Sequence, residues 1–263
     1  MSDQKPITYI SYLRIDELLT LQSPESEPEE HDEMLFIVIH QVYELWFKQI
    51  LHEVDHLCAL LRDTNAPSAL HTLNRMLTIF KTVVAQIDVL ETMTPMEFNS
   101  FRSFLASSSG FQSIQFRELE FALGYKRLNM LNHFPEETFH YAKLKQRFES
   151  PSLWDAFLHF LSANGADIPQ DLLERDVTGA IEASEGLQAG LISVYRNNHE
   201  LMQVCERLVD FDEGFQEWRY RHMRMVQRTI GSKPGTGGSP GVAYLSSTIK
   251  SLYPDLWAIR SEL

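Results

Sequence analysis

Two long segments of the chain carry apolar residues at the spacing of an α-helix, and this pattern constrains the fold more than any other feature. At about 100° per residue, one narrow, mostly apolar stripe forms along the segment 33–62 and another along 187–230. The first stripe comprises Phe36, His40, Tyr43, Phe47, Ile50, Val54 and Leu57. The second comprises Val204, Leu208, Phe211, Phe215, Trp218, His222 and Met225. Each stripe therefore places one histidine among aromatic residues.

Helical periodicity also covers most of the remaining chain, whereas strand-like alternation is scarce. Helices are expected at 10–21, 33–62, 66–92, 95–105, 112–132, 136–149, 151–163 and 187–230, the last interrupted near 196–198, with one or two more at the C-terminus. Asp32 is the expected N-cap of the helix that starts at 33. No repeat or linker divides the chain, so we expect an all-α fold with a single domain, 1–263, built as a helical bundle.

Composition limits the classes of protein to which the chain can belong. Its 263 residues are 44% hydrophobic, enough for one large core, and its net charge of -13 argues against nucleic acid or an anionic membrane as main partner. No apolar run approaches the roughly 18 residues of a membrane helix, and the N-terminus lacks a signal-peptide pattern. Cys58 and Cys205 lie within apolar helical patterns, which indicates free thiols. A cytoplasmic protein is expected.

The histidines of the two stripes are candidates for a buried site. A histidine that faces a core costs free energy unless its ring nitrogens find partners or a metal takes one. For a single such histidine, hydrogen bonding within the core is the commoner explanation. Two of them, His40 and His222, favour a cofactor held between facing helices, and a flat macrocycle such as haem suits aromatic walls. Periodicity alone identifies neither the cofactor nor which histidine would bind it.

One short pattern competes with this interpretation. His52, Glu53 and His56 match HExxH, in which two histidines one turn apart bind zinc and the glutamate acts as a base. On the helical wheel, however, both histidines lie opposite the apolar stripe, and no third ligand follows at a suitable spacing. A zinc hydrolase is therefore a weak alternative.

Two further features suggest ligand contacts. Arg102 lies among Phe98, Phe101 and Phe104, where partial desolvation would strengthen a bidentate grip on a carboxylate; pairing with Glu97 is the competing explanation. The Gly-rich segment 231–241 does not match a nucleotide-binding loop. It could bind an anion through its backbone, close over a substrate, or only connect two helices.

Five segments together resemble the tryptophan 2,3-dioxygenase family over nearly the whole chain. They are TYISYLRIDELL (8–19), HDEMLFIVIHQVYELWFKQIL (31–51), FRSFLASSSGFQSIQFRELEF (101–121), WRYRHMRMVQRTIG (218–231) and GTGGSPG (235–241). The resemblance implies one haem b per subunit and insertion of both atoms of dioxygen across the indole C2–C3 bond of L-tryptophan. The product would be N-formylkynurenine.

The resemblance also implies roles for individual residues. His222 resembles the axial ligand of the haem iron, and His40 resembles the distal histidine that meets the indole N–H, with Phe36 packed on the indole. Arg102 resembles the clamp on the substrate carboxylate, and Thr236 resembles the residue that meets the substrate ammonium.

Further positions follow from the same resemblance. Ser109, Gly110 and Trp218 would contact the haem. Tyr9, Tyr12 and Leu13 resemble an N-terminal segment, within 1–21, that enters the pocket of a neighbouring subunit in a homotetramer. Some family members carry tyrosine where this chain has Phe98, so Phe98 would line the substrate site without helping Arg102 through a hydroxyl. Phe116 is a similar variable position.

Two other functions remain open from sequence alone. A relative on the same scaffold could insert one oxygen atom into another indole, keeping both histidines and losing the carboxylate clamp. A non-catalytic haem-binding protein would keep His222 but would need neither Arg102 nor the Gly-rich segment.

Overall fold

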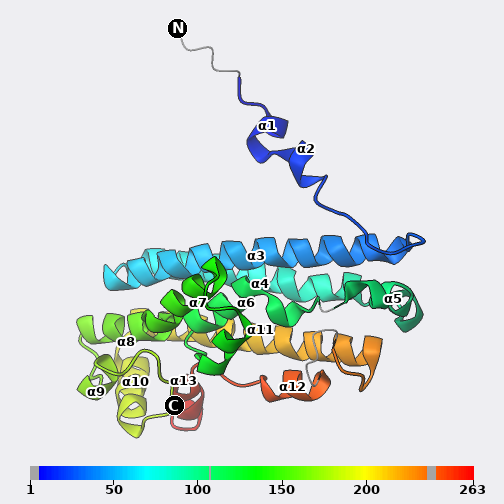
Figure 1. The fold of residues 1–263 in the computed structure, drawn as a ribbon. Helices are drawn as coiled ribbons and strands as arrows, with labels where there is room; N and C mark the ends of the chain where they lie inside the picture. The colour runs from blue at the N-terminus through cyan, green and yellow to red at the C-terminus, as the bar shows by residue number, and fades with distance from the viewer. Residues whose placement is uncertain (1–5, 107, 236–240) are drawn as a thin grey trace.

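The computed structural model describes residues 6–106, 108–235 and 241–263, and every regular element in these ranges is a helix. Three long helices form the body: α3 (His31–Arg62), α4 (Ala66–Leu90) and α11 (His199–Ile230). Both α3 and α11 pack along α4, as Figure 1 shows. The prediction of an all-α fold is confirmed.

The apolar stripes of α3 and α11 face the interior. From Tyr43 to Leu57 on α3, and from Val204 to Trp218 on α11, each stripe residue is buried in one contiguous core that also includes α4 and α8 (Leu153–Ala163). His40 and His222 are half-buried. The helical period therefore placed both histidines on the correct face of their helices.

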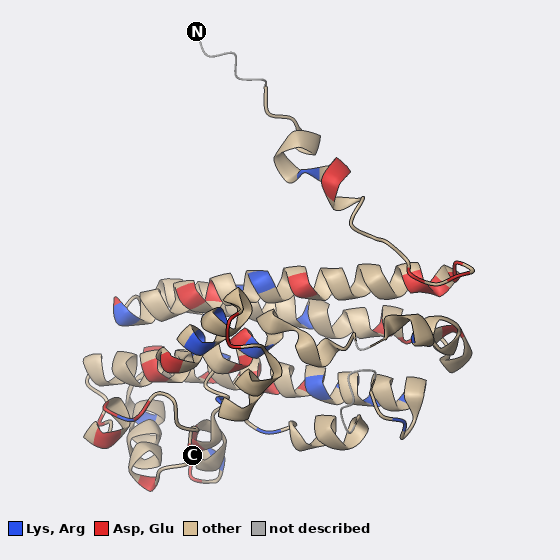
Figure 2. Ribbon diagram, in the orientation of Figure 1, with Lys and Arg blue, Asp and Glu red and all other residues tan. Residues whose placement is uncertain are grey.

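The N-cap predicted for α3 was wrong. The helix begins one residue before Asp32, and Glu30 occupies the N-cap position without a side-chain capping bond. Asp32 and Glu33 instead lie in the first turn, where negative charge is favourable beside the unpaired backbone N–H groups. Figure 2 shows the acidic residues that gather in the loop before this helix.

The N-terminal segment forms an arm apart from the body. The helix predicted over 10–21 is two short helices, α1 (Tyr9–Leu13) and α2 (Ile15–Leu18), because Arg14 adopts a left-handed conformation with φ of 52°. Figure 1 shows both helices extending away from the bundle. Tyr9 and Tyr12 are 75% and 74% exposed, so the arm's apolar side chains have no cover within the chain.

The middle of the chain is more broken than the sequence indicated. After α5 (Pro95–Phe101), short 3-10 turns η1 (Arg102–Leu105) and η2 (Gly110–Gln112) lead into α6 (Ile114–Ala122). The helix predicted over 112–132 ends early because Gly124 has φ of +99°, and a Cβ there would overlap the Ile181 side chain. A separate 3-10 turn, η3 (Leu128–His133), follows.

The predicted interruption near 196–198 is confirmed. α10 (Glu185–Asn197) ends there, and the Asn198 side chain accepts a hydrogen bond from the Leu201 N–H to cap α11. The remaining elements are α7 (Phe139–Glu149), α9 (Gln170–Leu173), α12 (Val242–Ser247), α13 (Pro254–Ala258) and η4 (Ile259–Ser261).

A buried carboxylate attaches the C-terminal segment to the body. Asp212, on α11, is 0% exposed and accepts hydrogen bonds from the backbone N–H groups of Leu252 and Tyr253 and from the Trp257 indole N–H at 2.8–3.2 Å. The carboxylate thus replaces the water that these donors lose on folding.

The prediction of two free thiols is confirmed. Cys58 and Cys205 are free thiols, and burial raises the pKa of each to about 12. Among the described residues, no helix is both long and apolar enough to cross a membrane.

Candidate active site

One cavity collects most of the residues singled out from the sequence. It lies between the N-terminal half of α3, the helix α5, and the C-terminal half of α11, with α6 and α12 completing its wall. Eight residues that were given a role in binding substrate or cofactor line the cavity: Phe36, His40, Phe98, Arg102, Ser109, Gly110, Trp218 and His222. Segments more than 180 residues apart in sequence thus converge on one space.

Aromatic side chains form the floor of the cavity and hold α3 against α11. The Trp218 ring lies edge-on to Phe47, with centroids 5.9 Å apart, and 4.9 Å from the Phe116 ring. Tyr43 lies 6.4 Å from Trp218 and donates its hydroxyl to the Val83 carbonyl at 3.1 Å. These contacts make an apolar base, and the His222 ring stacks on its Trp218.

The hydrogen bond of His40 fixes which ring nitrogen is free. Its Nδ1 lies 2.7 Å from the Phe36 carbonyl oxygen, which can only accept, so Nδ1 carries the proton. Burial lowers the pKa of His40, although the Phe36 carbonyl and the Glu44 carboxylate act in the opposite direction. The imidazole is therefore neutral near pH 7 and presents Nε2 as a hydrogen-bond acceptor.

His222 lies across the cavity on α11. Its ring stacks parallel to Trp218, with an interplanar angle of 3°. Burial, reinforced by positive charge nearby, lowers the pKa of His222 to about 4. A neutral imidazole held in a fixed plane has a lone pair available for a metal ion.

Phe36 and Phe98 form an apolar wall beside His40. The Phe36 ring lies 4.1 Å from the His40 ring and 5.8 Å from the Phe98 ring, measured between centroids. Phe101, which is fully buried, supports both phenylalanines from behind. A flat aromatic ligand beside His40 would contact apolar surface on this side.

Arg102 is half-buried at the rim and is bound to the Gly-rich segment. Its Nη2 donates to the Pro234 carbonyl at 2.7 Å. The pairing with Glu97 that the sequence allowed is not formed, because the Glu97 carboxylate accepts from the Thr94 N–H in a capping box at the start of α5. The guanidinium therefore has no carboxylate partner in the described chain.

The turn at 109–110 offers a flat, uncovered patch of backbone. The Ser109 hydroxyl accepts from the Phe111 N–H at 3.3 Å and starts η2. At Gly110, a Cβ would meet no described atom within 4 Å, so open space lies directly above its backbone. Any larger residue would project into this space.

The HExxH pattern does not form a metal site. His52 and His56 are exposed, as predicted, and Glu53 is buried in an ion pair with Arg75 at 3.2 Å. Within the described residues, no group of three or more histidine, cysteine or acidic side chains could hold a metal ion.

Four residues named from the sequence are not among the described residues that line this cavity. Thr236 falls outside the described residues. Tyr9, Tyr12 and Leu13 belong to the exposed arm and do not line the cavity of their own chain.

Sequence reasoning missed an arginine-rich part of the wall. Arg117 and Arg219 line the cavity together with Tyr244, and both arginines contact the buried Glu120. Arg117 and Glu120 are three residues apart on α6, so their pairing could have been read from the sequence. The third partner, 99 residues further along the chain, could not.

Comparisons with known proteins agree with this arrangement of residues. The family model described as tryptophan 2,3-dioxygenase matches residues 2–150 and 174–263. The chain is 62% identical, over 98% of each chain, to a protein of Herpetosiphon aurantiacus named tryptophan 2,3-dioxygenase. Proteins of that name from Anaeromyxobacter dehalogenans and an Arthrobacter species are 53% and 46% identical, over 98% of this chain and 96% and 92% of theirs. With both histidines on one cavity and matches that span nearly its whole length, the chain belongs to the tryptophan 2,3-dioxygenase family.

Proposed function

We propose that the protein uses dioxygen to cleave the indole C2–C3 bond of L-tryptophan, giving N-formylkynurenine, with haem b as its cofactor. Membership of the family supports the reaction. The observation that carries the proposal for this chain is the pair of neutral histidines, His40 and His222, that face one aromatic cavity from α3 and α11.

The residues present fit a haem. His222 offers an unprotonated imidazole, Trp218 keeps its ring in one plane, and the open space above Gly110 leaves room for a flat group against the backbone. His222 would hold the iron, with Ser109, Gly110 and Trp218 around the macrocycle. When bound, the haem supplies an iron with one open position for dioxygen.

His40 would orient the indole. Since Nδ1 donates to the Phe36 carbonyl, Nε2 is left to accept a hydrogen bond, and an indole N–H is a donor without acceptor capacity. Phe36 would pack on the indole ring at the same time. Accepting this hydrogen bond increases the electron density of the indole and fixes which ring edge faces the oxygen.

Arg102 would bind the substrate carboxylate. Its planar guanidinium lies at the cavity rim without an acidic partner in the described chain and beside the apolar Phe98. A carboxylate there gains a charge-assisted, bidentate contact in a partly desolvated place. Thr236, two residues after Pro234 in the sequence, would contact the ammonium group of the substrate. The amino-acid end of the substrate would thus fix the position of the indole.

The exposed arm supports an oligomer. Tyr9, Tyr12 and Leu13 form apolar surface on two short helices that extend away from their own chain. We propose that these residues complete the pocket of a neighbouring subunit in a homotetramer. Such exchange would bury surface that a single chain leaves in water.

The reaction is tested with the haem-loaded, reduced protein, L-tryptophan and isotopically labelled dioxygen. We expect N-formylkynurenine that carries two labelled oxygen atoms. A product with one labelled atom would instead indicate a monooxygenase. A ferrous, haem-loaded protein whose spectrum does not respond to L-tryptophan, and which forms no product, would indicate a haem-binding protein without this activity.

A further inference from the structure

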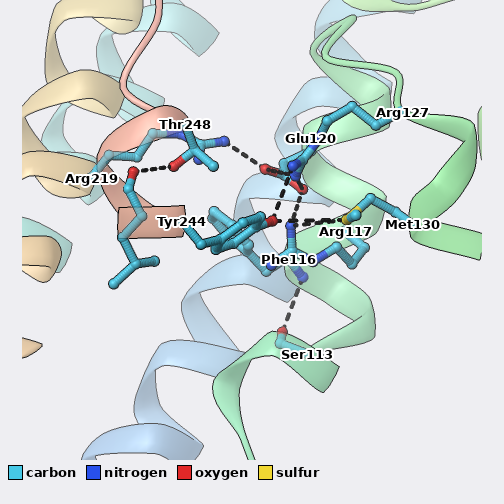
Figure 3. A network of polar contacts seen from close by, with 10 residues as sticks. Ser113, Phe116, Arg117, Glu120, Arg127, Met130, Arg219, Tyr244 and Thr248 are labelled. Atoms are coloured by element: carbon cyan, nitrogen blue, oxygen red, sulfur yellow. Dashed lines mark hydrogen bonds and ion pairs between the residues drawn. The ribbon is translucent and has the colours of Figure 1, made fainter. Parts of the chain in front are cut away.

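A buried carboxylate holds three arginines together beside the cavity. Glu120 on α6 is 0% exposed, and it accepts from Arg117 at 2.5 Å, Arg219 at 2.6 Å and Arg127 at 3.0 Å. Figure 3 shows these three side chains converging on Glu120 from α6, from α11 and from the turn that follows α6. We call these four residues the Glu120 cluster.

The Glu120 cluster has an excess of positive charge. Three guanidiniums surround one carboxylate, which leaves two positive charges uncompensated within the cluster. The neighbouring acid on α6, Glu118, is already paired with Lys143 and Arg147. Burial would raise the pKa of Glu120, but the three guanidiniums outweigh it and hold the pKa below its ordinary value. Buried charge without a counter-charge is costly, so the cluster is suited to an anionic ligand.

Two of the three arginines face the cavity. Arg117 and Arg219 both line it, and each uses one terminal nitrogen on Glu120. The Arg117 Nε is buried and has no hydrogen-bond partner among the described residues. The remaining N–H groups of Arg117 and Arg219 are therefore available to a ligand in the cavity. Arg127, by contrast, binds Glu120 and the Tyr244 hydroxyl.

Aromatic rings keep the guanidiniums in place. The Arg117 guanidinium lies 4.9 Å from the centre of the Phe111 ring, and the Arg219 guanidinium lies 4.7 Å from that of Phe215. Cation–π contacts of this kind stabilise a charged group that has left water. Glu120 pairs with Arg117 on its own helix and with Arg219 on α11, so it fixes the spacing of two cationic groups on one wall.

We propose that Glu120 is a positioning residue which holds Arg117 and Arg219 as a fixed dication, and that this dication binds the two carboxylates of the haem. The inference rests on the proposed function. The ligand it requires is a flat, apolar body with two anionic groups at one edge, set against two guanidiniums at the edge of an aromatic cavity. Arg102 is not a member of the cluster, and without a carboxylate partner among the described residues it remains available to the substrate carboxylate.

The test compares two porphyrins that differ only in these carboxylates. The full chain, freed of haem, is titrated with hemin and with hemin dimethyl ester, and the absorption band of the bound porphyrin is followed. We expect hemin to bind more tightly by roughly tenfold or more for each charged contact, because the ester cannot form charge-assisted hydrogen bonds with the two guanidiniums. Equal affinities for the two porphyrins would overturn the proposal, and this comparison needs no variant.

Variants then assign the preference to residues. Arg117→Met and Arg219→Met should each reduce the preference for hemin over its ester. The matched control is Arg221→Met, on the same helix but paired with Asp88 and Glu91, which should leave the preference unchanged. A loss of preference in the control, or its retention in both Arg117→Met and Arg219→Met, would contradict the assignment.

Glu120→Gln tests the positioning role. The amide keeps the size of the side chain but leaves three guanidiniums to repel one another, so we expect the preference for hemin to fall, and Glu120→Asp to restore part of it. A wild-type preference in Glu120→Gln would show that the carboxylate does not position the arginines. If neither porphyrin binds to the wild-type chain, haem is not the cofactor of this protein and the proposed function fails. If both bind equally, only the role of the Glu120 cluster fails.

Discussion

The indole ring of Trp218 lies parallel to the imidazole of His222, with their centroids 5.2 Å apart. Both residues come from the same face of α11, four positions apart, so the helix itself sets the stack. The contact restricts rotation of the imidazole and gives the lone pair of its free nitrogen one fixed direction. The stack with Trp218 therefore orients the candidate metal ligand.

Replacing His222 should remove the cofactor. We expect His222→Ala to abolish stable haem binding, because no other described histidine on this side of the cavity could take its place. The absorption spectrum of the purified protein measures the bound haem. His52→Ala, which removes an exposed histidine of the HExxH pattern, should keep full haem content and activity. Full haem occupancy in His222→Ala would place the ligand elsewhere.

Replacing Arg102 should weaken substrate capture. We expect Arg102→Ala to raise KM for L-tryptophan by an amount equivalent to about 2–5 kcal/mol, the usual cost of truncating one partner of a desolvated charge pair. Steady-state kinetics with L-tryptophan give this value. Tryptamine, which lacks the carboxylate, serves as the control substrate, and its slower turnover should be the same in both proteins. An unchanged KM for L-tryptophan would exclude Arg102 as the clamp.

The acid limb of the pH profile should lie below the ordinary histidine value. His40 must be neutral to accept a hydrogen bond, and burial lowers its pKa from the usual 6.5. As pH falls, the imidazole therefore stays unprotonated through pH 6.5 and is protonated only at lower pH. The profile of kcat/KM against pH measures this limb. A midpoint at or above 6.5 would contradict a neutral, acceptor role for His40.

The carboxylate of Asp212 should contribute measurably to stability. Asp212→Asn removes a charged acceptor from the N–H groups of Leu252 and Tyr253, so we expect the free energy of unfolding to fall by roughly 1.5–3 kcal/mol. Urea unfolding followed by tryptophan fluorescence gives this value. Asp210→Asn is the matched control, since Asp210 forms a half-exposed pair with Arg207 and should change stability by less than about 1 kcal/mol. Equal effects of the two substitutions would show that the Asp212 carboxylate is not the anchor.

The sequence predicted those parts of the fold that follow from one helix at a time. The period of 3.6 residues correctly predicted that the stripes of α3 and α11 are buried and that His52 and His56 are exposed. These predictions succeed because the face on which a residue lies depends only on its own helix. The interruption at Asn198 was also readable, since asparagine favours the N-cap position. Nothing in the sequence indicates that Arg14 adopts a left-handed conformation, so a single helix was predicted over 10–21, where the structure has α1 and α2.

Other parts of the site depend on contacts between distant segments. α6 ends early, before Gly124, where a Cβ would overlap the side chain of Ile181 from a loop more than 50 residues later. The Glu120 cluster likewise joins α6 to α11. Neither pairing leaves a periodic trace in the sequence, so both needed the three-dimensional arrangement.

The arm formed by α1 and α2 has a consequence for how such an enzyme would respond to its own concentration. If Tyr9 and Tyr12 act in a neighbour's pocket, a single chain has an intact arm but an incomplete active site. Its own arm cannot complete that site. Specific activity would then decline on dilution below the point where subunits separate, and mixing two inactive preparations, one armless and one lacking His222, would restore part of it.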